Sequence, residues 1–138
     1  MTTDANKLLV RRYIEEIINR NDLDRLAEFV AFDYVETGDP AGASRGPQRA
    51  REHLVGVRTT FPDLCLKVGD QIAEGDWVVT RVTAVATHLG TWMGIKPTGK
   101  RLIFHGVNVD KVMAGRIVEH GGAADMLTPL LEAGAVRP

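Results

Sequence analysis

The chain has 138 residues, of which 44% are hydrophobic and 25% are charged, and its formal net charge is −1. These values are typical of one soluble globular domain, so a single domain over residues 1–138 is expected. A charge this close to zero offers no positive field for nucleic acid or for an anionic membrane, and neither is an expected partner.

The cysteine content and the N-terminus bear on the compartment. The single cysteine, Cys65, excludes an intrachain disulfide. No apolar run approaches the roughly 20 residues of a membrane-spanning helix, and the opening MTTDANK lacks the basic and apolar regions of a signal peptide. We therefore expect a cytoplasmic protein that has no membrane anchor.

The N-terminal part of the sequence is predicted to be helical. Thr3 or Asp4 can cap a first helix, which should end near residues 20–22. Its apolar residues recur at helical spacing: Leu9, Tyr13, Ile14, Ile17 and Ile18. A second short helix is expected over residues 23–30.

A loop and a third helix should follow. Residues 31–46, AFDYVETGDPAGASRG, contain Gly, Pro and Ser at the density of a loop and are predicted to form a long irregular connection. Pro47 suits the first position of a helix that should end near Phe61 and Pro62. Three helices are therefore expected before any strand.

From Leu64 onward the apolar period changes from helical to two, which is typical of strands. The predicted strands cover residues 64–68, 77–88, 101–113 and 116–120. Gly and Pro interrupt residues 89–100, a predicted loop, and residues 124–134 can form a last helical turn or two. Helices followed by a meander of strands indicate the α+β class, with helices packed on one face of an antiparallel sheet.

In two predicted strands, the residues that share a face indicate where a pocket could lie. In residues 77–88 the small Ala84 and Ala86 share one face, where they either leave space for a pocket or let a helix approach closely. In residues 101–113 the even positions share a face with Phe104. If that face is the inner one, Asn108 and Asp110 are polar groups in an apolar cavity and need each other, water or a ligand. The pattern does not say which face is inside.

Motifs for several common chemistries are absent from the sequence. The four histidines, at positions 53, 88, 105 and 120, show neither the i, i+4 pairing of a helical zinc site nor an accompanying cysteine cluster, so no metal is expected. Neither a phosphate-binding loop nor GxSxG occurs, which removes support for nucleotide binding and serine hydrolase chemistry.

Three segments are the most specific: THLGTWMGIKPTGKR, AGRIVEH and DMLTPLLEAGAV. Together with RRYIEEIINRNDLDRLAEFVAFDYVE, they closely resemble the SnoaL-like polyketide cyclase family of the NTF2-like superfamily, over nearly the whole chain. The resemblance implies a cone in which three N-terminal helices wrap a curved antiparallel sheet around a deep apolar pocket. It also implies a homodimer formed through the outer face of the sheet.

Characterised cyclases of this family close a polyketide ring by an intramolecular aldol reaction and use no metal or organic cofactor. The resemblance places their catalytic aspartate at Gly122 of this chain, and glycine cannot transfer a proton. It matches His120 to the strand histidine, Asn108 to a pocket histidine and Glu36 to a pocket asparagine. It also matches Asp125 to a terminal-helix aspartate, which here suits the role of a helix cap better.

His120 is the predicted acid–base residue, because an imidazole titrates near neutral pH. Asn108 is the predicted partner of a developing oxyanion, and Asp110 is a further catalytic candidate. The expected substrate contacts are Glu36, His88, Trp92, Phe104 and Gly122. Purely structural roles stay open for some of these residues. His120 and His88 could be histidines at strand ends whose hydrogen bonds are all made within the protein, and Trp92 could pack in the core.

Two classes of function are consistent with these residues. One is a cofactor-free enzyme that performs aldol cyclisation, isomerisation or dehydration on a hydrophobic carbonyl compound, with His120 as base. The other is a non-catalytic binding protein for a hydrophobic small molecule, which Gly122 favours. An epoxide hydrolase-like enzyme is a third alternative of the same fold.

Overall fold

The computed structural model describes residues 2–37 and 44–137, so residues 38–43 of the predicted connection lie outside the described residues. The elements are α1 (Thr3–Arg12), the π-helical turn η1 (Tyr13–Ile18), the 3-10 helix η2 (Leu23–Glu28), β1 (Val30–Glu36), α2 (Pro47–Thr60), β2 (Cys65–Glu74), β3 (Trp77–Thr87), β4 (Arg101–Met113), β5 (Arg116–Ala124) and α3 (Leu127–Glu132). No helix within the described ranges is long and apolar enough to cross a membrane.

The three predicted N-terminal helical segments are present. α1 runs directly into η1, and the capping hydroxyl belongs to Thr2, one residue before the predicted cap, where it accepts a hydrogen bond of 3.1 Å from the Ala5 amide. The apolar stripe of this segment is buried at Tyr13, Ile14, Ile17 and Ile18. The helix therefore packs the face that its periodicity predicts.

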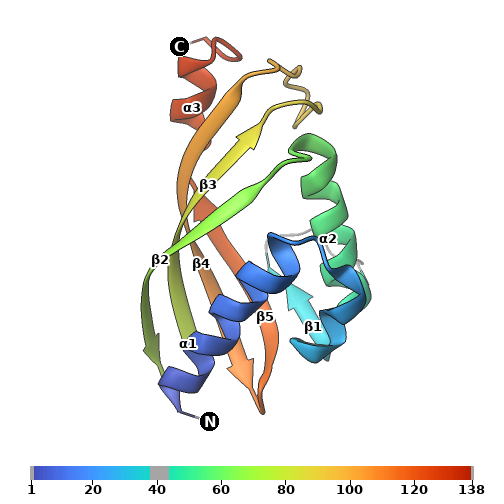
Figure 1. Cartoon of the computed structure of the whole chain (residues 1–138), viewed down its shortest axis with the longest axis vertical. Coiled ribbons are helices and arrows are strands. Elements are labelled where there is room, and N and C mark those ends of the chain that lie inside the picture. The colour runs from blue at the N-terminus through green and yellow to red at the C-terminus, as the bar shows by residue number, and fades with distance from the viewer. Residues whose placement is uncertain (1, 38–43, 138) are drawn as a thin grey trace.

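The strands form one five-stranded sheet in the order β1-β5-β4-β3-β2 (Figure 1). Strands β2 to β5 pair antiparallel as neighbours along the chain. Helices and a curved sheet give an α+β fold, which confirms the predicted class. Figure 1 shows α1 lying across the sheet and α2 standing beside β1.

Strand β1 is the main difference from the prediction. Residues 30–36 were expected to end a helix and begin a loop, yet they form a strand that pairs parallel with β5. Only Val30, Tyr34 and Glu36 of this strand are buried, so the apolar alternation is incomplete, and Phe32 is exposed. The pairing with β5, about 80 residues away, is a long-range contact that local periodicity does not reveal. The sheet is therefore mixed.

The even positions of β3 and β4 face the helices. Val78, Thr80, Val82, Ala84 and Ala86 of β3 are all buried, as are Leu102, Asp110 and Val112 of β4. The register pairs even with even positions, for example Ala84 with Phe104, so both sets lie on one face. This settles which face is inside: Asn108 and Asp110 point toward the helices.

Candidate active site

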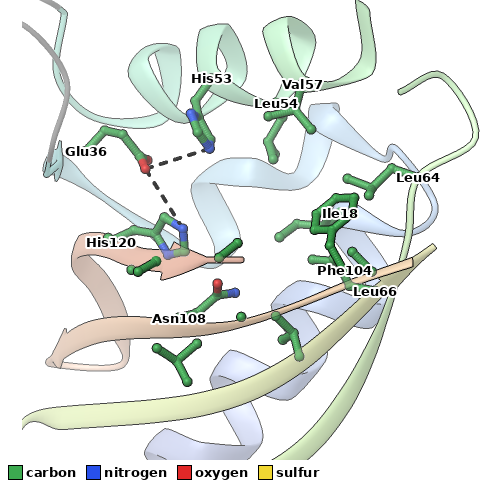
Figure 2. Close-up of a pocket in the computed structure, with 18 of the residues that line it drawn as sticks. Ile18, Glu36, His53, Leu54, Val57, Leu64, Leu66, Phe104, Asn108 and His120 are labelled. Carbon is green, nitrogen blue, oxygen red and sulfur yellow. Dashed lines mark ion pairs between the residues drawn. The ribbon is translucent and has the colours of Figure 1, made fainter. Parts of the chain in front are cut away.

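A cavity of about 580 Å³ lies between the inner face of the sheet and the helical segments η1 and α2. Figure 2 shows its apolar wall, formed by Ile18, Leu54, Val57, Leu64, Leu66 and Phe104. Small residues of the sheet make room for it, since Ala84, Gly106 and Gly122 are part of the lining. Ala86 is not part of the lining, and both alanines belong to the buried apolar cluster that also contains Leu130 of α3.

The polar groups gather at one end of the cavity (Figure 2). The strand register builds this group, because Glu36 of β1 lies beside His120 of β5, and His120 lies opposite Asp110 of β4. The next inward-facing pair is Gly122 and Asn108. A row of three titratable side chains thus crosses three neighbouring strands.

His120 is oriented by a hydrogen bond to Asp110. The Nδ1 atom of His120 is 2.6 Å from Oδ1 of Asp110, a buried carboxyl group that does not line the cavity. Burial alone lowers the pKa of the imidazole, but the charge of Asp110, its hydrogen bond and the charge of Glu36 raise the pKa to about 9. The pair therefore holds a proton on His120 and leaves Nε2 facing the cavity.

Glu36 is oriented by Tyr34 of the same strand. The Tyr34 hydroxyl donates a hydrogen bond to Oε2 of Glu36, and both residues are buried. Burial, reinforced by the Glu36 charge, raises the pKa of Tyr34 far above its usual value, so the hydroxyl stays protonated. This contact leaves Oε1 of Glu36 directed at the two histidines, as Figure 2 shows.

His53 of α2 completes the cluster and was not predicted as a site residue. Its Nε2 atom is 3.7 Å from Oε1 of Glu36, and Nε2 of His120 is 3.9 Å from the same oxygen. Burial lowers the pKa of His53 more than the Glu36 charge raises it. One sequence signal was available: His53 lies at helical spacing from the inward-facing Ala50 and Val57.

The structure brings most of the predicted site residues together. The cavity lining includes Glu36, Trp92, Phe104, Asn108, His120 and Gly122. Asp110, a predicted catalytic residue, lies outside the lining and bonds to the ring of His120. His88, a predicted substrate contact, is not part of the lining.

His88 lies just after β3 and is fully buried. Its Nδ1 atom accepts a hydrogen bond of 3.3 Å from the Thr98 amide, and its ring packs against Phe61 with 5.9 Å between centroids. These contacts tie the loop over residues 89–100 to the end of the strand.

The predicted cap role of Asp125 is confirmed, because its carboxylate accepts hydrogen bonds from the amide and hydroxyl of Thr128.

Gly122 is imposed by the backbone of the sheet. It adopts φ +149°, and a Cβ atom there would overlap the carbonyl oxygen of Val107 on β4. At Gly121 a Cβ atom would overlap the hydroxyl of Thr37, which donates a hydrogen bond to the carbonyl of His120. The two glycines after His120 therefore let neighbouring strands approach closely and leave no room for a side chain.

The comparisons with known proteins agree with this fold. The family model of the SnoaL-like polyketide cyclases matches residues 8–132. The chain belongs to this family. Among curated proteins, it is 30% identical over 122 residues to the nogalonic acid methyl ester cyclase of Streptomyces nogalater, covering 84% of this chain and 88% of that protein.

Two other members show how far the likeness extends. The aklanonic acid methyl ester cyclase of Streptomyces peucetius is 25% identical over 122 residues, covering 86% of this chain and 83% of that protein. The crystal structure of IdmH from Streptomyces antibioticus superposes with a TM-score of 0.78 at 32% identity, covering 94% of this chain and 98% of that one. The family fold thus extends over almost the whole described chain.

Proposed function

We propose that this protein catalyses acid–base chemistry on a hydrophobic carbonyl compound without an organic cofactor, and that aldol ring closure of a polyketide is the reaction. The observation that carries the proposal is the Asp110–His120 pair, whose Nε2 atom faces the cavity beside Glu36. The names of the related cyclases support the same substrate class. Asn108 lies on the strand opposite and lines the same cavity.

The geometry suits proton donation by His120 better than the predicted role of base, because Asp110 holds a proton on the imidazole. In the proposed reaction the Glu36 carboxylate takes a proton from the carbon beside a substrate carbonyl. His120 Nε2 and the Asn108 amide then stabilise the negative charge on the oxygen of the enolate. Attack of that carbon on a second carbonyl closes the ring, and His120 donates the proton to the new alkoxide. The proton on Glu36 then passes to His120, whose Nε2 atom lies 3.9 Å from Oε1 of Glu36, and both groups are restored.

Replacement of Asp110 by asparagine tests this function. We expect kcat to fall by roughly 10²-fold, because the amide cannot hold the protonated imidazole that the reaction needs. The measurement is the rate of cyclised product by mass spectrometry, with the methyl esters of aklanonic acid and nogalonic acid, after which the related cyclases are named, as substrates. Asp70→Asn is the matched control, since the Asp70 side chain is 84% exposed. Equal rates for the two variants would contradict the assigned role of Asp110.

The second candidate, ligand binding without turnover, is favoured by the absence of a carboxylate at Gly122. The same polyketides distinguish the two candidates. Quenching of tryptophan fluorescence without any product would favour a binding protein, because Trp92 lines the cavity. Product formation that requires Asp110 supports the enzyme.

We also propose that the protein is a cytoplasmic homodimer formed through the outer face of the sheet. Apolar side chains on this face are exposed in the single chain, among them Ile72 at 71% and Ile103 at 53%. Light scattering at micromolar concentration should report the mass of two chains. Ile103→Lys should shift the equilibrium to one chain by placing a charge in the interface. A wild-type protein with the mass of one chain would contradict the dimer.

A further inference from the structure

We propose that Glu36, His53 and His120 form a binding site for one divalent transition metal ion, with Zn²⁺ as the best-suited probe. The three residues come from β1, α2 and β5, and Figure 2 shows their side chains turned toward one another at the polar end of the cavity. One ligand atom from each residue lies within 4.8 Å of the other two. This convergence arises from the fold alone, since the residues are far apart in the sequence.

The donor set and spacing suit such an ion. Two imidazole nitrogens and one carboxylate oxygen are ligands that zinc and its neighbours accept, with a further position left open. Metal–ligand distances of about 2.0–2.2 Å imply about 3.4 Å between ligand atoms in a tetrahedral site. Glu36 Oε1 is 3.7 Å from His53 and 3.9 Å from His120, so these two pairs need movements of only a few tenths of an ångström. The ligand nitrogens of the two histidines lie within 4.8 Å of each other and approach by up to about 1.4 Å when the site closes.

A second observation is independent of these distances. Two of the ligand side chains already make a hydrogen bond through their other polar atom, which fixes their orientation. His120 Nδ1 bonds to Asp110 at 2.6 Å, and Glu36 Oε2 accepts from the Tyr34 hydroxyl. A carboxylate behind a ligating histidine, which fixes the ring and leaves Nε2 for the ion, is the usual arrangement around protein-bound zinc. Two buried carboxyl groups beside two imidazoles also favour a cation electrostatically.

The ion would displace the proton on Nε2 of His120 and bind that nitrogen and Oε1 of Glu36, the two atoms to which the proposed reaction assigns proton transfer. The open position would face the apolar cavity. We therefore infer that bound Zn²⁺ inhibits that reaction. The binding itself does not depend on the reaction, so the proposed function can fail while the metal site stands.

The experiment titrates chelator-treated protein with zinc chloride in a calorimeter, in a Cys65→Ser background that removes the exposed thiol. We expect one ion per chain. His53→Gln and Glu36→Gln should each weaken binding about 100-fold or more, and Asp110→Asn about 10- to 100-fold. His105→Gln is the matched control, because His105 lies on the outer face of β4, where it contacts Thr83.

A second measurement uses protein with all three ligand residues intact, so its result does not depend on whether the ligand variants fold. The zinc-edge X-ray absorption spectrum of the Cys65→Ser protein should show two imidazole nitrogens and no sulfur around the ion. The proposal is overturned if the protein binds no zinc at micromolar concentrations. It is also overturned if folded His53→Gln protein binds as tightly as the His105→Gln control, or if the spectrum lacks imidazole ligands.

Discussion

Replacement of His120 by glutamine is expected to lower kcat/KM for ring closure by about 10²- to 10⁴-fold, the range that a positioned proton donor contributes. Glutamine keeps a polar group of similar size beside Asp110 but has no proton to transfer near neutral pH. The measurement is the initial rate of cyclised product with the wild type and the variant. Circular dichroism and the midpoint of urea unfolding show whether the variant is folded.

The matched control for this prediction is His105→Gln, which removes an imidazole from the exposed side of the same sheet. It should retain the wild-type rate. If His120→Gln also retains that rate, His120 does not move the proton, and the role of acid and base falls to Glu36 or His53. If neither wild type nor variant forms product, the binding function is the better description.

Substitution of Gly122 by aspartate is expected to destabilise the fold strongly and to produce no cyclase activity. Any Cβ atom at this position would overlap the carbonyl oxygen of Val107, and the backbone at φ +149° suits only glycine. Backbone strain of this kind costs about 1–3 kcal/mol, and the overlap adds to it. We expect a loss of about 3 kcal/mol or more in the free energy of unfolding, measured by urea denaturation.

The control for the backbone contribution is Gly75→Ala. Gly75 also has a positive φ, +58°, but an added Cβ atom there meets nothing within 4 Å. Its loss of stability should therefore be the smaller, about 1 kcal/mol. A Gly122→Asp protein as stable as Gly75→Ala would contradict the close approach of β4 and β5. We therefore expect that one substitution cannot introduce the aspartate that the resemblance places at this position.

Local patterns predicted much of the site. The change from helical to alternating periodicity near Leu64 identified the α+β class, and alternation in β4 placed Asn108 and Asp110 on one face. The family resemblance singled out Glu36, Gly122 and His120. The predicted class and the shared face are confirmed, because side-chain direction follows from the period of the element, whatever the element packs against. The site roles taken from the resemblance stay predictions.

The spacing of the histidines in the sequence, by contrast, predicted no metal ligands, although three potential ligands meet in space. His53 is on a helix, His120 on the last strand, and neither has a partner nearby in the sequence. Sequence spacing detects a metal site most readily when at least two of its ligands lie within a few residues of each other. Whether the cluster binds an ion is the question that the zinc titration answers.

The sequence by itself therefore determined the helices, the positions of strands β2 to β5, which residues of a strand share a face, and the family. The tertiary structure decided which residues meet: it added β1 as a parallel strand, set Glu36 beside His120 and His120 opposite Asp110, brought His53 above them and kept His88 out of the cavity. The physical reason is that strand register and helix docking are fixed by contacts between distant segments. A shift of one residue in either pairing would turn His120 to the other face of the sheet or move it away from Asp110.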